Sequence, residues 1–217
     1  MTEAELRAAT VATWTPRDGR HARAIICPHW DVTAEGQIEE IFGACSASMT
    51  ALPAAKTILE VGCGMGRILK PLSTRFPRLI GLDVSSKMLD LAREYLVDAL
   101  PKVDLGLIGP DGKYPVSDGT VDLAFSIITF QHMPSHAVVS QSFREVLRIL
   151  RPGGLFRVQT HIGEPPRPGE YRGMIGCFYP TPRSFAAEAS SVGFEVVSVR
   201  MTDRPPWIWL TARKPNV

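Results

Sequence analysis

Two hydrophobic periods alternate along most of the chain. Short apolar runs rich in β-branched residues are followed by longer segments in which apolar residues recur every three or four positions. The short runs predict strands at 57–62, 78–84, 103–108, 121–127, 155–161, 194–202 and 207–212, and the longer ones predict helices at about 66–75, 86–99, 138–150 and 181–192. Alternating strands and helices indicate an α/β fold, a mostly parallel sheet covered on both faces. The last two strands are joined by a short turn, so we expect an antiparallel hairpin.

The N-terminal quarter has a weaker pattern. Residues 3–12 predict a short helix, 16–23 a polar break, and the apolar positions after Thr33 a second helix capped by that threonine. We interpret residues 1–50 as cap helices of the same domain as a core at 51–217. A proline- and glycine-rich loop at about 163–182 is long enough to favour a substrate lid.

Composition narrows the class of protein only slightly. The chain has 217 residues, 45% hydrophobic and 21% charged, with a formal net charge of +2, which fits one globular domain and no nucleic-acid partner. Its four cysteines are far apart and have no zinc-site spacing, which favours reduced thiols in a cytoplasmic protein. The first residues are acidic and polar, and no apolar run could span a membrane. We expect a monomer or a homodimer.

A glycine-rich stretch, ILEVGCGMGRIL at residues 58–69, is the most informative part of the chain. Gly62, Gly64 and Gly66 lie between a predicted strand and a predicted helix, where glycine permits a sharp turn and lets a ligand approach the backbone. The third glycine of a dinucleotide-binding GxGxxG motif is replaced by Arg67. Asp83 ends the next strand, where a carboxylate can accept hydrogen bonds from a ribose diol. The pattern therefore predicts an adenosine with a free ribose.

Four stretches, in this order, resemble the motifs of class I S-adenosylmethionine-dependent methyltransferases of the small-molecule type. They are ILEVGCGMG, GLDVSSKML, YPVSDGTVDLAFS and LRILRPGGLF, within residues 57–156. The resemblance implies a single Rossmann-like domain, a seven-stranded sheet of order 3-2-1-4-5-7-6, and S-adenosylmethionine as the cofactor. The implied cofactor contacts are Glu60, Gly62, Cys63, Gly64 and Gly66 for the methionine part, Asp83 for the ribose, and Val84 and Met88 beside the adenine, with Ile127 as a further cofactor contact. Pro110 replaces the family's adenine-binding aspartate, and the neighbouring Asp111 is the candidate substitute.

Methyl transfer to a hydroxyl group needs a base, and histidine is the natural partner near neutral pH. His132, His136 and His161 follow the fourth and fifth predicted strands, at the edge of the sheet where ligands bind. His132 has a structural alternative, which is packing its loop against the cofactor. His136 could instead cap the following helix, and His161 is next to the expected lid. The candidate acceptor contacts are Trp30, Asp31, Tyr171, Arg172 and Tyr179. Asp31 and the three histidines could also hold a divalent metal such as magnesium.

The leading hypothesis is O-methylation of a sugar, glycoside or phenolic hydroxyl. The sequence Ser126-Ile127-Ile128-Thr129 lacks the Asn/Asp-Pro-Pro-Tyr pattern that positions amino groups in related enzymes. Two alternatives stay open: C- or N-methylation of a natural product, and a non-catalytic subunit that binds S-adenosylmethionine within a complex.

Overall fold

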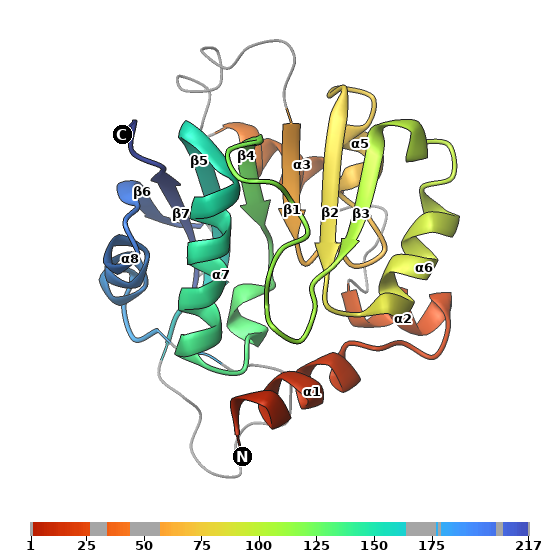
Figure 1. Ribbon diagram of the computed structural model, residues 1–217, viewed down its shortest axis with the longest axis horizontal. Coiled ribbons are helices and arrows are strands. Elements are labelled where there is room, and N and C mark those ends of the chain that lie inside the picture. Colours follow the sequence, from red (N-terminus) through yellow and green to blue (C-terminus); the bar gives the residue numbers. More distant parts are fainter. Residues whose placement is uncertain are drawn as a thin grey trace.

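The computed structural model describes residues 2–26, 34–43, 57–163, 177, 179–202 and 206–216. Seven strands form one sheet of order β3-β2-β1-β4-β5-β7-β6, as the resemblance implied (Figure 1). The strands are β1 Thr57–Val61, β2 Arg78–Asp83, β3 Val103–Leu107, β4 Val121–Ser126, β5 Leu150–His161, β6 Glu195–Met201 and β7 Trp207–Arg213. The strands up to β5 pair in parallel, and β7 pairs antiparallel with both β5 and β6. The predicted fold class and terminal hairpin are confirmed.

Helices cover both faces of this sheet. They are α1 Glu3–Thr13, α2 Gly19–Ile26, α3 Ala34–Gly43, α5 Leu69–Leu72, α6 Ser86–Tyr95, α7 His136–Ile149 and α8 Pro182–Ser191, with short 3-10 turns η1 Leu100–Lys102 and η2 Phe130–His132. Every residue of β1 and β4 is buried, as expected for central parallel strands. Within the described part of the chain, no helix is long and apolar enough to cross a membrane.

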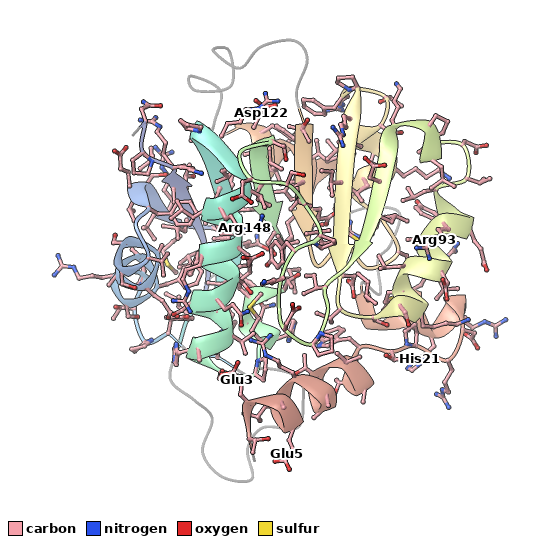
Figure 2. All side chains as sticks on the ribbon, viewed as in Figure 1. Glu3, Glu5, His21, Arg93, Asp122 and Arg148 are labelled. Carbon is pink, nitrogen blue, oxygen red and sulfur yellow. The ribbon has the colours of Figure 1, made fainter. Side chains whose placement is uncertain are left out.

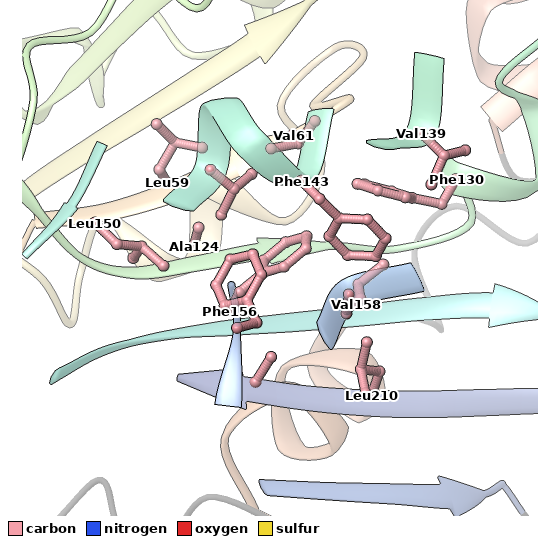
Figure 3. Packing of buried hydrophobic residues seen from close by; sticks show 14 of the residues in the cluster. Leu59, Val61, Ala124, Phe130, Val139, Phe143, Leu150, Phe156, Val158 and Leu210 are labelled. Atoms are coloured by element: carbon pink, nitrogen blue, oxygen red, sulfur yellow. The ribbon is translucent and has the colours of Figure 1, made fainter. Parts of the chain in front are cut away.

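Two hydrophobic clusters hold the layers together. Alternate residues of β1 belong to different clusters, because successive side chains of a strand point to opposite faces. One cluster joins the sheet to α7 and α8 through aromatic side chains, including Phe143 of α7 against Phe156 of β5, with ring centroids 5.8 Å apart (Figure 3). The other joins it to α3, α5 and α6. The sheet is thereby a rigid platform that fixes the carboxyl ends of its strands.

The predicted polar break at 16–23 is wrong, because α2 begins at Gly19. The Asp18 side chain accepts a hydrogen bond from the backbone N–H of His21 at 2.8 Å and so caps the helix. Ala22 is fully buried and packs in a small cluster with Met65 and Met88. This short helix is therefore fixed by a tertiary contact that a local pattern does not reveal.

The helix predicted at 66–75 is also wrong in extent, since only Leu69–Leu72 is helical. Gly64 and Gly66 have φ angles of 53° and 80°, outside the helical region, so the segment after β1 runs through turns first. The helix predicted at 86–99 ends at Tyr95, and β5 begins at Leu150 instead of residue 155.

Several N-terminal and loop predictions fall outside the described residues. Thr33, the boundary near residue 50 and most of the 163–182 loop are among them. The division into cap and core therefore stays a prediction.

Candidate active site

A cavity of about 750 Å³ lies at the carboxyl ends of β1, β2 and β4. This is the edge where ligands bind in parallel α/β sheets. Helix α1 lies across the same edge of the sheet (Figure 1) and lines the cavity with residues from Ala4 to Ala12. The other lining residues come from the glycine-rich loop, the ends of β2, β3 and β4, the turn η2 and the first half of α7. The cavity is therefore enclosed between the sheet edge and the N-terminal helix.

The three glycines of the loop have different surroundings. All have positive φ angles, 77° at Gly62, 53° at Gly64 and 80° at Gly66. A Cβ atom at Gly62 would lie 2.4 Å from two atoms of the Thr129 side chain, and one at Gly66 would lie 2.5 Å from Leu96. Gly62 and Gly64 line the cavity, whereas Gly66 does not and packs against the end of α6. Glycine at residue 66 is thus required by packing and backbone conformation.

Asp83 connects the glycine-rich loop to the end of β2. Its two carboxylate oxygens accept hydrogen bonds from the backbone N–H groups of Gly64 and Ser85, both at 2.9 Å. Burial raises the pKa of Asp83, and these amide hydrogen bonds act in the opposite direction. Each oxygen has a second lone pair, and Asp83 lines the cavity, so the carboxylate can also accept hydrogen bonds from ribose hydroxyls.

Glu60 is a buried carboxylate at the end of β1, 4% exposed, and it also lines the cavity. Burial raises its pKa well above the usual range, while Arg67 acts to lower it. Its Oε2 atom has no hydrogen-bond partner among the described residues. A buried acceptor without a partner is costly, and the ammonium group of a methionine moiety would satisfy it. The polar groups on this side therefore fit S-adenosylmethionine, with Asp83 for the ribose and Glu60 for the amino group.

The predicted adenine contacts are only partly brought together. Val84, Met88 and Ile127 line the cavity, as does Cys63 of the loop. The Asp111 side chain does not, because its Oδ1 atom accepts a hydrogen bond from the backbone N–H of Lys113 at 3.1 Å. Its neighbours Gly109, Pro110 and Gly112 do line the cavity. The Asp111 carboxylate thus stabilises its own turn and lies outside the cavity wall.

Of the three candidate bases, only His132 lines the cavity. Its ring lies 4.6 Å from that of Trp14, just after α1, and its Nε2 atom is 3.1 Å from Nε2 of Gln131. His132 belongs to η2, the turn that follows β4 and lies beside Thr129. His132 and the glycine-rich loop therefore line the same cavity.

His136 and His161 lie elsewhere. His136 is exposed at the first turn of α7, with Nδ1 3.1 Å from Glu188 of α8. His161 ends β5 and packs edge-on against Trp207, with ring centroids 5.4 Å apart. Burial lowers the pKa of His161. Within the described ranges, no three side chains of His, Cys, Asp or Glu are grouped closely enough to hold a metal ion, so the three histidines do not form one site.

Among the predicted acceptor contacts, Tyr179 alone is described, and it is not in the cavity wall. It is 2% exposed, and its hydroxyl donates a hydrogen bond to Glu188. Burial and the same glutamate raise the pKa of Tyr179. Trp30, Asp31, Tyr171 and Arg172 fall outside the described residues. Tyr179 therefore connects the end of the loop to α8.

Sequence patterns missed one whole wall of the cavity. Arg7 and Trp14 lie on or just after α1, while Tyr114 and Ser142 come from the β3–β4 connection and α7. The helix at residues 3–12 was predicted, but its pattern did not indicate which side chains would face a ligand. An arginine and a tryptophan seven residues apart on one short helix were the available signal.

Known proteins resemble both the sequence and the fold. Residues 58–154 match the family model of a methyltransferase domain. Over 107 residues, 48% of this chain, the sequence is 36% identical to trans-aconitate 2-methyltransferase of Azoarcus sp. (strain BH72). It is 29% identical to a ubiquinone biosynthesis O-methyltransferase of Dechloromonas aromatica (strain RCB) over 107 residues, 49% of this chain. These alignments cover 39% and 45% of the two relatives, so the chain matches less than half of their length.

A solved structure extends the likeness to most of the chain. A SAM-dependent methyltransferase from Aquifex aeolicus superposes with a TM-score of 0.67 at 19% identity, over 91% of this chain and 98% of that one. Such low identity shows the fold alone. The match over residues 58–154, which is less than half of the chain, and the sheet order around it support the family that the sequence motifs resemble, the class I S-adenosylmethionine-dependent methyltransferases.

Proposed function

We propose that the protein methylates a hydroxyl oxygen of a small molecule, with His132 as the general base. The observation that carries the proposal is the position of His132, which shares one cavity with the glycine-rich loop and Asp83. The O-methyltransferase among the relatives supports the same reaction type. A sugar, a glycoside or a phenolic compound is the acceptor class that we test first.

The residues of the site have two roles, binding of the cofactor and proton transfer. S-adenosylmethionine supplies an electrophilic methyl group when it is bound. Glu60, Asp83 and the loop at Gly62 and Gly64 would hold the cofactor at the sheet edge, and α1 covers the cavity and limits the access of water. The imidazole of His132 takes the proton of the acceptor hydroxyl as that oxygen is methylated. The cofactor would supply the methyl group, its carbon–sulfur bond would break as the carbon–oxygen bond forms, and S-adenosylhomocysteine would leave. Trp14 packs against the His132 ring and restricts its orientation.

The test compares single alanine variants of two histidines. Pools of sugars, glycosides and phenolics are screened for transfer of a labelled methyl group, with and without magnesium, and kinetics then follow on the best acceptor. We expect His132→Ala to lower kcat by about 10²- to 10⁴-fold. Its affinity for S-adenosylhomocysteine, measured by calorimetry, should stay within about threefold. His136→Ala is the matched control, because His136 is exposed and outside the cavity.

The outcomes separate the competing functions. Normal turnover in His132→Ala would refute the base mechanism and favour C- or N-methylation, in which alignment suffices. Binding of S-adenosylhomocysteine without methyl transfer to any pool favours a non-catalytic cofactor-binding subunit. Absence of S-adenosylhomocysteine binding by the wild-type protein contradicts the whole proposal.

A further inference from the structure

One group of lining side chains, here called the polar end, consists of residues that are not among the predicted cofactor contacts. The three are Arg7 from α1, Tyr114 from the connection between β3 and β4, and Ser142 from α7. The remaining charged residues of the described lining, Glu60, Asp83 and Arg67, belong to the glycine-rich loop and the ends of β1 and β2. Among the charged residues of the described lining, Arg7 is therefore the one that comes from neither the glycine-rich loop nor these strand ends.

The Arg7 side chain is 18% exposed and firmly positioned. Its Nε and Nη2 atoms donate to Oε1 of Glu3 at 3.2 and 2.9 Å, and Nη2 also donates to the Gln141 side chain. Its Nη1 atom lies 2.9 Å from the place that a Cβ atom of Gly112 would take. Glycine at residue 112, with φ of 71°, leaves room for the guanidinium.

The pairing with Glu3 leaves Arg7 able to bind another anion. The Glu3 side chain is 48% exposed, and an ion pair on a helix surface is weak in water. Figure 2 shows Glu3 on the side of α1 nearer α7 and Glu5 on the opposite side. Guanidinium groups bind carboxylates through several parallel N–H donors, so a second carboxylate could share or replace Glu3.

Tyr114 offers a neutral donor beside this cation. It is 4% exposed, and among the described residues its hydroxyl has no hydrogen-bond partner at ordinary distance. Burial raises the pKa of Tyr114, whereas the Ser142 hydroxyl and the Arg7 charge act to lower it, so both groups lie near the phenol oxygen. A buried donor without an acceptor is unfavourable, and a ligand oxygen would satisfy it.

Much of the remaining lining of the cavity is apolar, including Ala4, Ala8, Val11, Ile108, Met133 and Val138. Arg7 and Trp14, which packs on His132, are seven residues apart. A helix rises about 1.5 Å per residue, so roughly 10 Å separates them along α1. A ligand that reaches both would have an apolar body, an anionic group at one end and a hydroxyl at the other.

We propose that Arg7, Tyr114 and Ser142 bind a carboxylate of the acceptor, and that the acceptor is a small hydroxy acid with an apolar body. This inference rests on the proposed function, because it takes His132 as the place where the hydroxyl reacts. Arg7 provides charge and parallel N–H donors, and Tyr114 and Ser142 provide hydroxyl donors. Specificity for an acid then comes from α1, while the cofactor is held by the sheet edge.

The test uses acid and amide pairs that differ in charge but hardly in shape. The probes are 4-hydroxybenzoate, 4-hydroxyphenylacetate and 4-hydroxycinnamate with their primary amides, titrated by calorimetry into wild-type protein saturated with S-adenosylhomocysteine. We expect at least one acid to bind about tenfold or more tightly than its amide. Arg7→Gln should weaken binding of that acid by about 10- to 100-fold and leave the amide within threefold. Tyr114→Phe should weaken it by about 3- to 10-fold.

Two further variants sharpen the test. Arg93→Gln is the matched control, since Arg93 also pairs with a carboxylate on its own helix but is exposed and outside the cavity. Glu3→Gln removes the carboxylate that competes for Arg7, so we expect acid binding to become about two- to fivefold tighter. If the ion pair between Glu3 and Arg7 is purely structural, Glu3→Gln will give no gain in affinity for the acid.

Three results would overturn the inference. They are equal or absent binding of every acid and amide pair, equal losses for acid and amide in Arg7→Gln, and a tenfold loss of S-adenosylhomocysteine affinity in Arg7→Gln. The last result would assign the polar end to the cofactor. These failures are distinct from failure of the proposed function, which would appear as no S-adenosylhomocysteine binding by the wild type or as normal turnover in His132→Ala.

Discussion

The close packing of the glycine-rich loop can be tested by adding one methyl group. Gly62 has a φ of 77°, and a Cβ atom there would lie 2.4 Å from Cγ2 and Oγ1 of Thr129. Gly119 has a φ of 64°, and a Cβ atom would meet nothing within 4 Å. Both alanine variants bear the left-handed backbone cost of about 1 kcal/mol. Gly62→Ala adds overpacking, typically about 1–3 kcal/mol, so we expect total losses of about 1 kcal/mol at residue 119 and 2–4 kcal/mol at residue 62.

The assay is equilibrium unfolding in guanidinium chloride, with the slope of the transition checked for constancy. Thr129→Ala removes the two atoms in closest contact, so the Gly62→Ala/Thr129→Ala double variant should regain at least about 1 kcal/mol over additivity. Affinity for S-adenosylhomocysteine should fall with Gly62→Ala and stay unchanged with Gly119→Ala. Equal stability losses at the two glycines, or strict additivity in the cycle, would refute the contact between the loop and Thr129.

Three other predictions concern buried carboxylates and a buried phenol. Asp83→Asn leaves one of two backbone N–H groups without an acceptor, so we expect the free energy of unfolding to fall by about 1–3 kcal/mol and the affinity for S-adenosylhomocysteine to fall tenfold or more. Asp90→Asn, at an exposed residue, is the control. Equal losses in the two variants would contradict this role of Asp83. Tyr179→Phe removes the hydrogen bond to Glu188, so we expect the free energy of unfolding to fall by about 1–2 kcal/mol and the affinity for S-adenosylhomocysteine to stay unchanged. A weaker affinity for S-adenosylhomocysteine in calorimetry would instead place Tyr179 at the cofactor site. Burial raises the pKa of Glu60, so the folded protein keeps this proton to a higher pH than the unfolded chain does, and the free energy of unfolding should fall as the pH rises from about 4.3 towards the folded pKa. Unfolding measured from pH 4 to 8 should show a flatter pH dependence in Glu60→Gln. An identical pH dependence in the variant and the wild type would disprove the raised pKa.

The fold was largely predictable because its signals are local. Apolar runs mark the strands, and the ordered motifs imply the sheet order that the structure has. The secondary-structure predictions are wrong where a tertiary contact or a backbone angle determines whether a segment is helical. Ala22 is buried by residues far along the chain, which makes α2 a helix where the local sequence is polar. The positive φ angles of Gly64 and Gly66 shorten α5 in a segment whose apolar spacing favoured a full helix.

The two sides of the site differ in how far they were predictable. The cofactor side is built from consecutive residues at strand ends, so Glu60, Gly62 and Asp83 could be identified from motifs, and all three line the cavity. The opposite side depends on contacts between distant residues. Arg7 meets Gln141, and no sequence period encodes such a pair. Three histidines were selected as candidate bases because each follows a strand at the ligand-binding edge of the sheet. That position does not give the direction of a side chain after a turn, and His132 alone of the three lines the cavity.

Helix α1 forms a wall of the cavity although none of its own residues is buried. An isolated helix of eleven residues is marginal in water, so α1 depends on its neighbours to stay folded. Ligands that fill the cavity add apolar contacts to α1, so docking of the helix and ligand binding are one linked equilibrium. The measured affinity is therefore the intrinsic affinity multiplied by the fraction of molecules with α1 docked. Hydrogen exchange of the α1 amides reports this fraction directly, and it should slow as ligand is added while exchange in β1 and β4 is unchanged.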